Sequence, residues 1–308
     1  MAYNDTAVSA DELTAKNNDA PMLIGNNLLE SFNAAAQWRV SGEWTAGTDV
    51  TVSGAPTRLA HDRNGKIVTR GSATTSTISL IFDIEASTSR AFDTVAIIGH
   101  NYAQSLPANV FVDISDNANF AGFVEVATFA APTTSKRKVS LSLTTGMGSN
   151  RRIDNIRYVR IRHEKGVNFS IMPQIGEVIL GRRRQLTAKA QIEFQDAPLR
   201  SSVTDFRSES GTLTRHKLYS GAGDRELNFK FGALTTTLDS EVSLRDWFTD
   251  CDNGSKAFGY IENPNSAPTD YHMMVLDPPE LIINMQGPFE FDADFNMIEI
   301  QPFLSSET

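Results

Sequence analysis

Histidine and cysteine are the side chains of this 308-residue sequence best suited to metal binding or nucleophilic chemistry, and both are sparse. No two histidines have His-x-x-x-His or His-Glu-x-x-His spacing, so we expect surface or strand-end histidines and no metal site. The single cysteine, Cys251, can form neither an internal disulfide nor a zinc cluster, and we expect it to be buried as a small hydrophobic residue. The five histidines are His61, His100, His163, His216 and His272.

The run Asp113–Asn119 places several oxygen ligands close together, as calcium sites do. It lacks the central glycine and the terminal glutamate of an EF-hand loop. Asp, Asn and Ser are also the ordinary residues of a turn that follows a strand. We therefore favour a turn over a calcium site.

Catalytic motifs are missing from the sequence. Gly221-Ala-Gly223 is half of a dinucleotide fingerprint without its third glycine or its strand-to-helix context, and a hairpin turn is the better interpretation. There is no Gly-x-Ser-x-Gly elbow and no phosphate-binding loop, and the carboxylates are scattered. We predict no catalytic, cofactor-binding or metal-binding residues and no enzyme, with a glycan-cleaving enzyme as a remote alternative.

Four aromatic residues could form a surface on which a sugar stacks. Burial is the favoured alternative, because aromatic side chains supply the largest buried area per residue. The four are Trp38, Trp44, Tyr102 and Phe120.

Charge argues against nucleic acid and anionic membranes as partners. The net charge is -9, from 28 basic and 37 acidic residues, whereas phosphate binding needs clustered Lys and Arg. Carboxylates without Lys or Arg fill residues 257–308, and arginines are dense between 136 and 184. We interpret both as solvated faces, or as faces that meet across a subunit boundary. No apolar run is long enough for a membrane helix, no secretory signal is visible, and the low cysteine content favours a reducing cytoplasm.

Short β-type runs dominate from Met22 onward, and no amphipathic helix separates those that precede residue 181. Such a series predicts an antiparallel sandwich or jelly roll. The Asn64-Gly65 dipeptide between runs predicts a type I′ hairpin. The predicted strands are 49–53, 76–84, 92–100, 109–115, 122–129, 138–144, 156–162 and 175–180.

The charged stretch Gly181–Gln185 follows a predicted strand and marks a predicted domain boundary, after which the sequence pattern changes. Strands are predicted at 190–194, 211–215, 225–232, 256–261 and 271–276, and one helix at 239–251, where Asp239 or Ser240 can cap the first turn. In the last strand the apolar parity changes at Ile298, which predicts a bulge or bend near Met297. We divide the chain into an arm (1–24), a β-sandwich (25–183) and a second β domain (184–308).

Residues 25–183 resemble galactose-binding-like (discoidin-type) β-sandwiches, as found in tailed-phage virion proteins. The resemblance lies in the order of the runs 92–102, 110–116 with Phe120, 157–162 and 175–181. In sugar-binding members of that family, loops at one end of the sandwich hold the ligand. The resemblance therefore implies a host glycan as a partner.

Residues 184–303 resemble phage tail-tip and tail-tube-like proteins. The matching stretches are 208–211, 225–232, Leu244–Phe248, 253–258 and the closing acidic strand. This resemblance implies a structural subunit of a tail-tip or baseplate ring, six copies being the expectation, assembled in the host cytoplasm and carried in the virion. Its partners would be copies of itself, tail tube, hub and fibre proteins. The alternative is a carbohydrate-binding module for host surface glycans.

Overall fold

A computed structural model gives the fold of the chain. It describes residues 4–7, 9–25, 27–32, 34–56, 69–71, 74–88, 90–130, 138–142, 151–186, 203–207, 213–217, 226–234, 241–267, 271–287 and 290–299. Within these residues the chain forms 21 strands and four helices, and the paired strands are antiparallel. The predicted fold class, mainly β, is confirmed. No helix in the described part of the chain is long and apolar enough to cross a bilayer.

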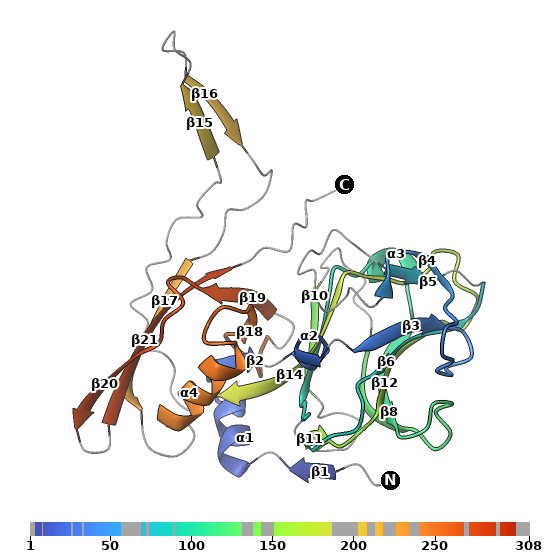
Figure 1. Cartoon of the computed structure of the whole chain (residues 1–308), viewed down its shortest axis with the longest axis horizontal. Coiled ribbons are helices and arrows are strands. Elements are labelled where there is room, and N and C mark those ends of the chain that lie inside the picture. Colours follow the sequence, from blue (N-terminus) through green and yellow to red (C-terminus); the bar gives the residue numbers. More distant parts are fainter. Residues whose placement is uncertain are drawn as a thin grey trace.

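A five-stranded sheet forms one layer of the N-terminal half (Figure 1). Along its central strand, β12, residues alternate between a core-facing set with Val159 and Ile161 and an outward set with Arg160 and Arg162. In spatial order the strands are β3 (Ala35–Arg39), β6 (Thr77–Asp83), β12 (Tyr158–Glu164), β8 (Asn109–Ser115) and β9 (Val124–Ala130).

The facing layer is one end of a nine-stranded sheet, formed there by β10 (Lys138–Ser142), β7 (Thr94–Ile98) and the first part of β14 (Glu177–Gln185). Val95 and Val178 from this layer and Leu80 and Val112 from the five-stranded sheet belong to one buried apolar cluster. Residues from both sheets thus fill a common core, as in a β-sandwich.

The same nine-stranded sheet continues into the C-terminal half. Residues 177–181 of β14 pair with β7, and residues 182–185 pair with β2 (Met22–Gly25). The rest of the order is β18 (Phe258–Ile261), β19 (Tyr271–Leu276), β21 (Glu290–Glu299) and β17 (Glu226–Leu234), with β20 (Ile282–Gly287) also on β21. One strand therefore crosses the predicted boundary at 183/184, and a strand from the predicted arm joins the two halves.

The predicted helix is present as α4 (Glu241–Asp250), which packs against the C-terminal part of the sheet (Figure 1). Its Trp247 is fully buried, with ring centroids 4.8 Å from Phe258 and 5.4 Å from Phe295. Leu244 and Cys251 are buried on the same apolar stripe, so the predicted burial of Cys251 is confirmed.

The first residues lie on the chain's own sandwich. β1 (Asn4–Ala7) pairs with β11 (Arg151–Asp154). At the start of α1 (Ala10–Asn17), Ser9 and Glu12 bond each other. The Glu12 amide donates to Ser9 Oγ, and the Ser9 amide donates to the Glu12 carboxylate. These two bonds form a capping box, which fixes where the helix begins.

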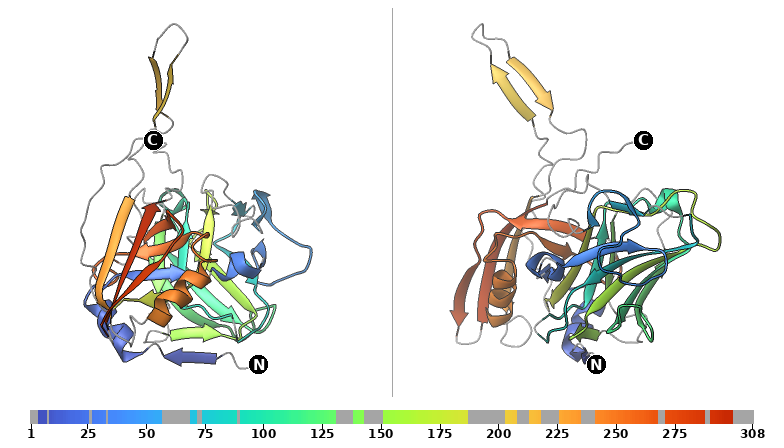
Figure 2. Two further views of the ribbon diagram at one scale, coloured as in Figure 1. Left: turned by 60° about the vertical axis from the view of Figure 1, so that its left-hand side comes forward. Right: turned by 45° about the vertical axis from the view of Figure 1, so that its right-hand side comes forward.

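The remaining elements are short. α2 (Leu28–Phe32) and α3 (Tyr102–Ser105) flank the sandwich, and β13 (Gln174–Ile175), β5 (Thr69–Gly71) and β4 (Thr51–Ser53) form a small sheet. The hairpin of β15 (Val203–Arg207) and β16 (Leu213–Lys217) stands apart from both halves (Figures 1 and 2).

The bulge predicted near Met297 is wrong. Met297 and Ile298 pair in regular register with both β17 and β19. Glu299 takes the inward position after Met297, is 8% exposed, and bonds His272 Nδ1 at 2.9 Å. The imidazole supplies the partner that a buried carboxylate needs. The strand therefore continues its alternation through Glu299 without a bulge. Irregular register on β21 lies instead opposite Phe231–Leu234 of β17 and opposite Met285–Gly287 of β20.

Several sequence predictions lie outside the described residues. These are the Asn64-Gly65 hairpin, the strand at 190–194, the turn at 221–223, and the helix cap at Asp239 or Ser240.

Candidate functional site

The outer face of the five-stranded sheet carries two arginines in its middle. Arg160 and Arg162 are two residues apart on β12, so strand alternation places both on the face away from the core. Across the strands, Arg160 is paired with Asp113 of β8, and Arg162 is paired with Ser79 of β6. The register alone therefore brings two cations, a carboxylate and a hydroxyl together.

Asp113 holds both guanidinium groups in place. Its Oδ2 accepts bonds of 2.8 Å from Nε of Arg160 and 2.8 Å from Nε of Arg162, and it lies 2.7 Å from Nη2 of Arg160. The Asp113 side chain is fully buried. Arg162 also bonds Glu125 and Glu164 at the solvent edge, whereas Arg160 shares its bonded carboxylate with Arg162.

Phenylalanine rings sandwich the arginines. The Arg160 guanidinium carbon lies 4.3 Å from the ring centroid of Phe120 and 4.6 Å from that of Phe123. Arg162 lies 4.1 Å from the Phe111 centroid and 5.4 Å from the Phe123 centroid. Such contacts keep planar cations in fixed orientations. Phe123 is 42% exposed, so one aromatic ring stands at the surface beside both arginines.

An open hollow of about 210 Å³ lies next to this cluster. Its apolar walls are Phe123 and Val40, and its polar lining includes Ser79, Arg160 and Arg162. The residues that line it are Val40, Ser41, Gly42, Thr77, Ser79, Phe123, Arg160 and Arg162. It thus combines an aromatic ring, hydroxyl groups and guanidinium groups, the groups that bind polyhydroxylated ligands.

Two polar atoms are the most telling features of the hollow. The Ser79 hydroxyl is buried and has no hydrogen-bond partner among the described residues. Nη1 of Arg160 points toward Gly42, where a Cβ atom would come within 2.6 Å of it. A side chain at this position would clash with the guanidinium, so glycine lets the loop lie close to Nη1.

Burial lowers the pKa of Arg160 from its ordinary value, although Asp113 acts in the opposite direction. The group remains a cation at neutral pH, since the ordinary pKa of arginine is above about 12. A desolvated cation attracts an anion or an acceptor oxygen more strongly than a hydrated one. The cluster can therefore bind and orient acceptor groups.

Three of the four aromatic residues considered for sugar stacking are buried, as favoured by the sequence. Trp38 and Tyr102 are 0% exposed and Phe120 is 3% exposed. Trp44 is partly buried and lies over Tyr158, with 6.2 Å between the ring centroids. The exposed aromatic residue at the hollow is Phe123, which sequence reasoning did not single out.

The run Asp113–Asn119 is a strand end followed by a turn, as favoured. The Asn117 amide donates to Ser115 Oγ, and the Ala121 amide donates to the Asn119 side chain. Asp113, the first oxygen ligand of the supposed calcium site, is committed to the two arginines.

The histidines described in atomic detail have structural partners. His163 is buried, its Nε2 accepts from the Tyr102 hydroxyl at 2.7 Å, and its Nδ1 donates to the Ile78 carbonyl. His100 stacks on Tyr102, with 4.1 Å between the ring centroids. Within the described residues, no three His, Cys, Asp or Glu side chains are placed to hold a metal ion.

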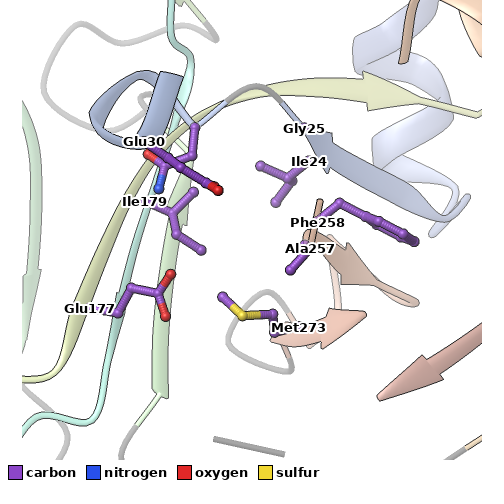
Figure 3. Close-up of a pocket in the computed structure, with 10 residues that line it drawn as sticks. Ile24, Gly25, Glu30, Glu177, Ile179, Ala257, Phe258 and Met273 are labelled. Atoms are coloured by element: carbon purple, nitrogen blue, oxygen red, sulfur yellow. The ribbon is translucent and has the colours of Figure 1, made fainter. Parts of the chain in front are cut away.

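A second hollow, with a cavity volume of only about 10 Å³, lies where the two halves meet (Figure 3). Glu30 of α2 and Glu177 of β14 line one side, and Phe258 and Met273 of the C-terminal half line the other. Glu177 is 4% exposed. Because the space is narrow and the Glu177 carboxylate is buried, we interpret this hollow as part of the contact between the two halves and not as a ligand site.

Sequence reasoning found the strand that carries the site but not the site itself. The signal was the alternation of Arg160 and Arg162 with apolar residues in a strand, which indicates a polar outer face. Ser79 gave no signal, because its role depends on which strand lies beside β12.

Comparison with known proteins finds no matching family model and no matching curated protein. Among solved structures, a Ruminococcus gnavus GH29 fucosidase is similar with a TM-score of 0.35 and 14% identity, over 51% of this chain and 26% of that chain. A chitosan-binding module from a Paenibacillus chitosanase/glucanase has a TM-score of 0.33 and 12% identity, over 51% of this chain and 98% of that chain. A CBM32 module of Clostridium perfringens, in complex with GalNAc-β-1,3-galactose, has a TM-score of 0.34 and 9% identity, over 49% and 96%. This chain spans about a quarter of the fucosidase.

Proposed function

We propose that this protein is a non-catalytic binding protein whose sandwich half binds a glycan in the hollow beside Phe123. The observation that carries the proposal is the exposed Phe123 ring next to two fixed guanidinium groups and an unpartnered buried hydroxyl. A sugar has an apolar face that packs on an aromatic ring, and hydroxyl oxygens that accept from Arg and Ser. The guanidinium groups are already fixed by Asp113, so binding costs little side-chain entropy.

The test is a glycan array probed with the full chain, followed by calorimetry on any glycan that binds. Phe123→Ala is expected to weaken binding about tenfold, because it removes the ring on which the sugar packs. Ile282→Ala is the matched control: Ile282 is 45% exposed, close to the 42% of Phe123, and lies on β20 of the other half. Absence of any bound glycan, or equal binding by the two variants, would reject the proposal.

A second candidate function is a self-assembling structural subunit of a phage tail tip, which the sequence resemblance implies. Two features favour it. The β15–β16 hairpin stands away from the body, where it could reach a neighbouring copy (Figures 1 and 2). Among the described strands, the nine-residue β17 is the last in its sheet, and an edge strand offers backbone groups for pairing with another chain.

Size-exclusion chromatography with light scattering tests this candidate. We expect the full chain to form a closed oligomer, and a variant with residues 203–217 replaced by a short Gly-Ser linker to remain monomeric. Cryo-electron microscopy of the phage particle would then locate the subunit. A monomer at all concentrations would remove this candidate and leave glycan binding untouched.

A further inference from the structure

The hollow has an excess of positive charge at its inner end. Arg160 and Arg162 share the buried carboxylate of Asp113, and the other two carboxylates bonded to Arg162 are more than one-third exposed at the rim. An exposed carboxylate is screened by water and compensates a cation weakly. The buried side of the cluster thus holds two cations against one anion.

The donors that remain face the same space. Nε and Nη2 of Arg160 bond Asp113, and Nη1 lies beside Gly42, which lines the hollow together with Arg160. The Ser79 hydroxyl, buried and unpartnered, lines the same hollow. A buried hydroxyl without a partner costs free energy, which a bound acceptor would recover.

From this arrangement we infer that the hollow selects acidic sugars, with the sugar carboxylate accepting from Nη1 of Arg160 and from the Ser79 hydroxyl. The inference rests on the proposed glycan binding and adds the charge class of the ligand. A carboxylate fits because charge-assisted bonds to a guanidinium are short and strong. The Phe123 ring then packs against the apolar face of the same sugar.

The experiment compares pairs of saccharides that differ in one charge. Calorimetry with the full chain would use tri-galacturonic acid against its methyl ester, and sialyllactose against lactose. We expect at least one acidic saccharide to bind and its neutral partner to bind about tenfold more weakly or not at all, and we expect added salt to weaken the acidic complex. The pair that shows the difference identifies the type of acidic sugar.

Ser79→Ala is the test on the protein side. The substitution removes an atom that has no partner in the free protein, so folding is expected to be unaffected. We expect it to weaken binding of the acidic saccharide by about tenfold and to weaken binding of the neutral partner less, because a charge-assisted bond is stronger than one to a sugar hydroxyl.

The outcomes separate the two proposals. Equal binding of acidic and neutral partners, or binding of neutral glycans alone, would overturn the charge selectivity and keep glycan binding. An acidic saccharide that binds Ser79→Ala as tightly as the native chain would place the carboxylate elsewhere and overturn the inference. If no saccharide binds at all, both proposals fail.

Discussion

At the scale of single residues, three buried carboxylates of the chain lie beside partners that compensate their charge. Glu299 pairs with His272, Asp113 pairs with two arginines, and Asp93 accepts from the Arg183 amide and from Arg152. Buried charges without such partners would be strongly destabilising. The Ser79 hydroxyl is one of several buried polar atoms without a hydrogen-bond partner among the described residues, as are Trp247 Nε1 and the Tyr271 hydroxyl, and it is the one among them that lines the hollow.

His163 makes the stability of the protein depend on pH. Burial lowers the pKa of His163 from its ordinary value to about 4. The unfolded chain therefore binds a proton at this residue between about pH 6.5 and pH 4, whereas the folded chain does not. The contribution is complete above pH 6.5 and is lost as the pH falls toward 4, by about 3 kcal/mol in all.

Denaturant unfolding at a series of pH values measures this effect. In His163→Gln, which cannot take up the proton, we expect a flatter dependence of the unfolding free energy between pH 6.5 and pH 5. Carboxylates titrate in both proteins and cancel in the comparison. Parallel curves for the two proteins would contradict the assignment.

At the scale of elements, glycine decides how closely β18 and β19 approach each other. A Cβ atom at Gly259 would lie 2.3 Å from Cε2 of Tyr271 and 2.5 Å from its hydroxyl oxygen. The Tyr271 ring is itself buried, so it has little room to move. The close approach requires glycine at this position.

Gly259→Ala is expected to destabilise the fold by about 1–3 kcal/mol, because the added methyl group overpacks the junction between the halves. Gly166→Ala is the control, since a Cβ there meets nothing within 4 Å. We expect the control to lie within about 0.5 kcal/mol of the native chain in chemical denaturation. Equal unfolding free energies of the two variants would contradict the prediction, because they would mean that β19 moves to accept the methyl group without loss of stability.

At the scale of the whole molecule, one sheet joins the two halves. β2 lies between β14 and β18, so its backbone bonds connect the sandwich to the C-terminal strands. Met22 and Ile24 of β2 pack with Ile98 and Met273 in a cluster shared by both halves. Such a junction favours unfolding as a single unit.

Native-state hydrogen exchange, read by mass spectrometry in increasing denaturant, tests this coupling. We expect peptides from β6 and β12 and peptides from β18 and β19 to lose protection at the same denaturant concentration. Earlier exchange of the β18 and β19 peptides alone would mean that the C-terminal half opens independently.

Local pattern was enough to predict most strands and one helix. Strands such as 109–115 and 271–276 have bounds identical to those predicted, because apolar alternation is a property of neighbouring residues. The helix was predicted from its apolar stripe and is present as α4. Short elements such as β2 and α3 carry too few residues to show a period, and the sequence did not indicate them.

The sequence by itself therefore determined that this chain is mainly β, and it favoured burial of Trp38, Tyr102 and Phe120. The two-residue spacing of Arg160 and Arg162 within a predicted strand also places both on one strand face. Only the tertiary structure decided that Asp113, Ser79 and Phe123 meet these arginines, and that β2 joins the two halves. The physical reason is that strand periodicity is encoded within about ten residues. The neighbour of each strand is fixed instead by burial and hydrogen bonding between segments far apart in the chain.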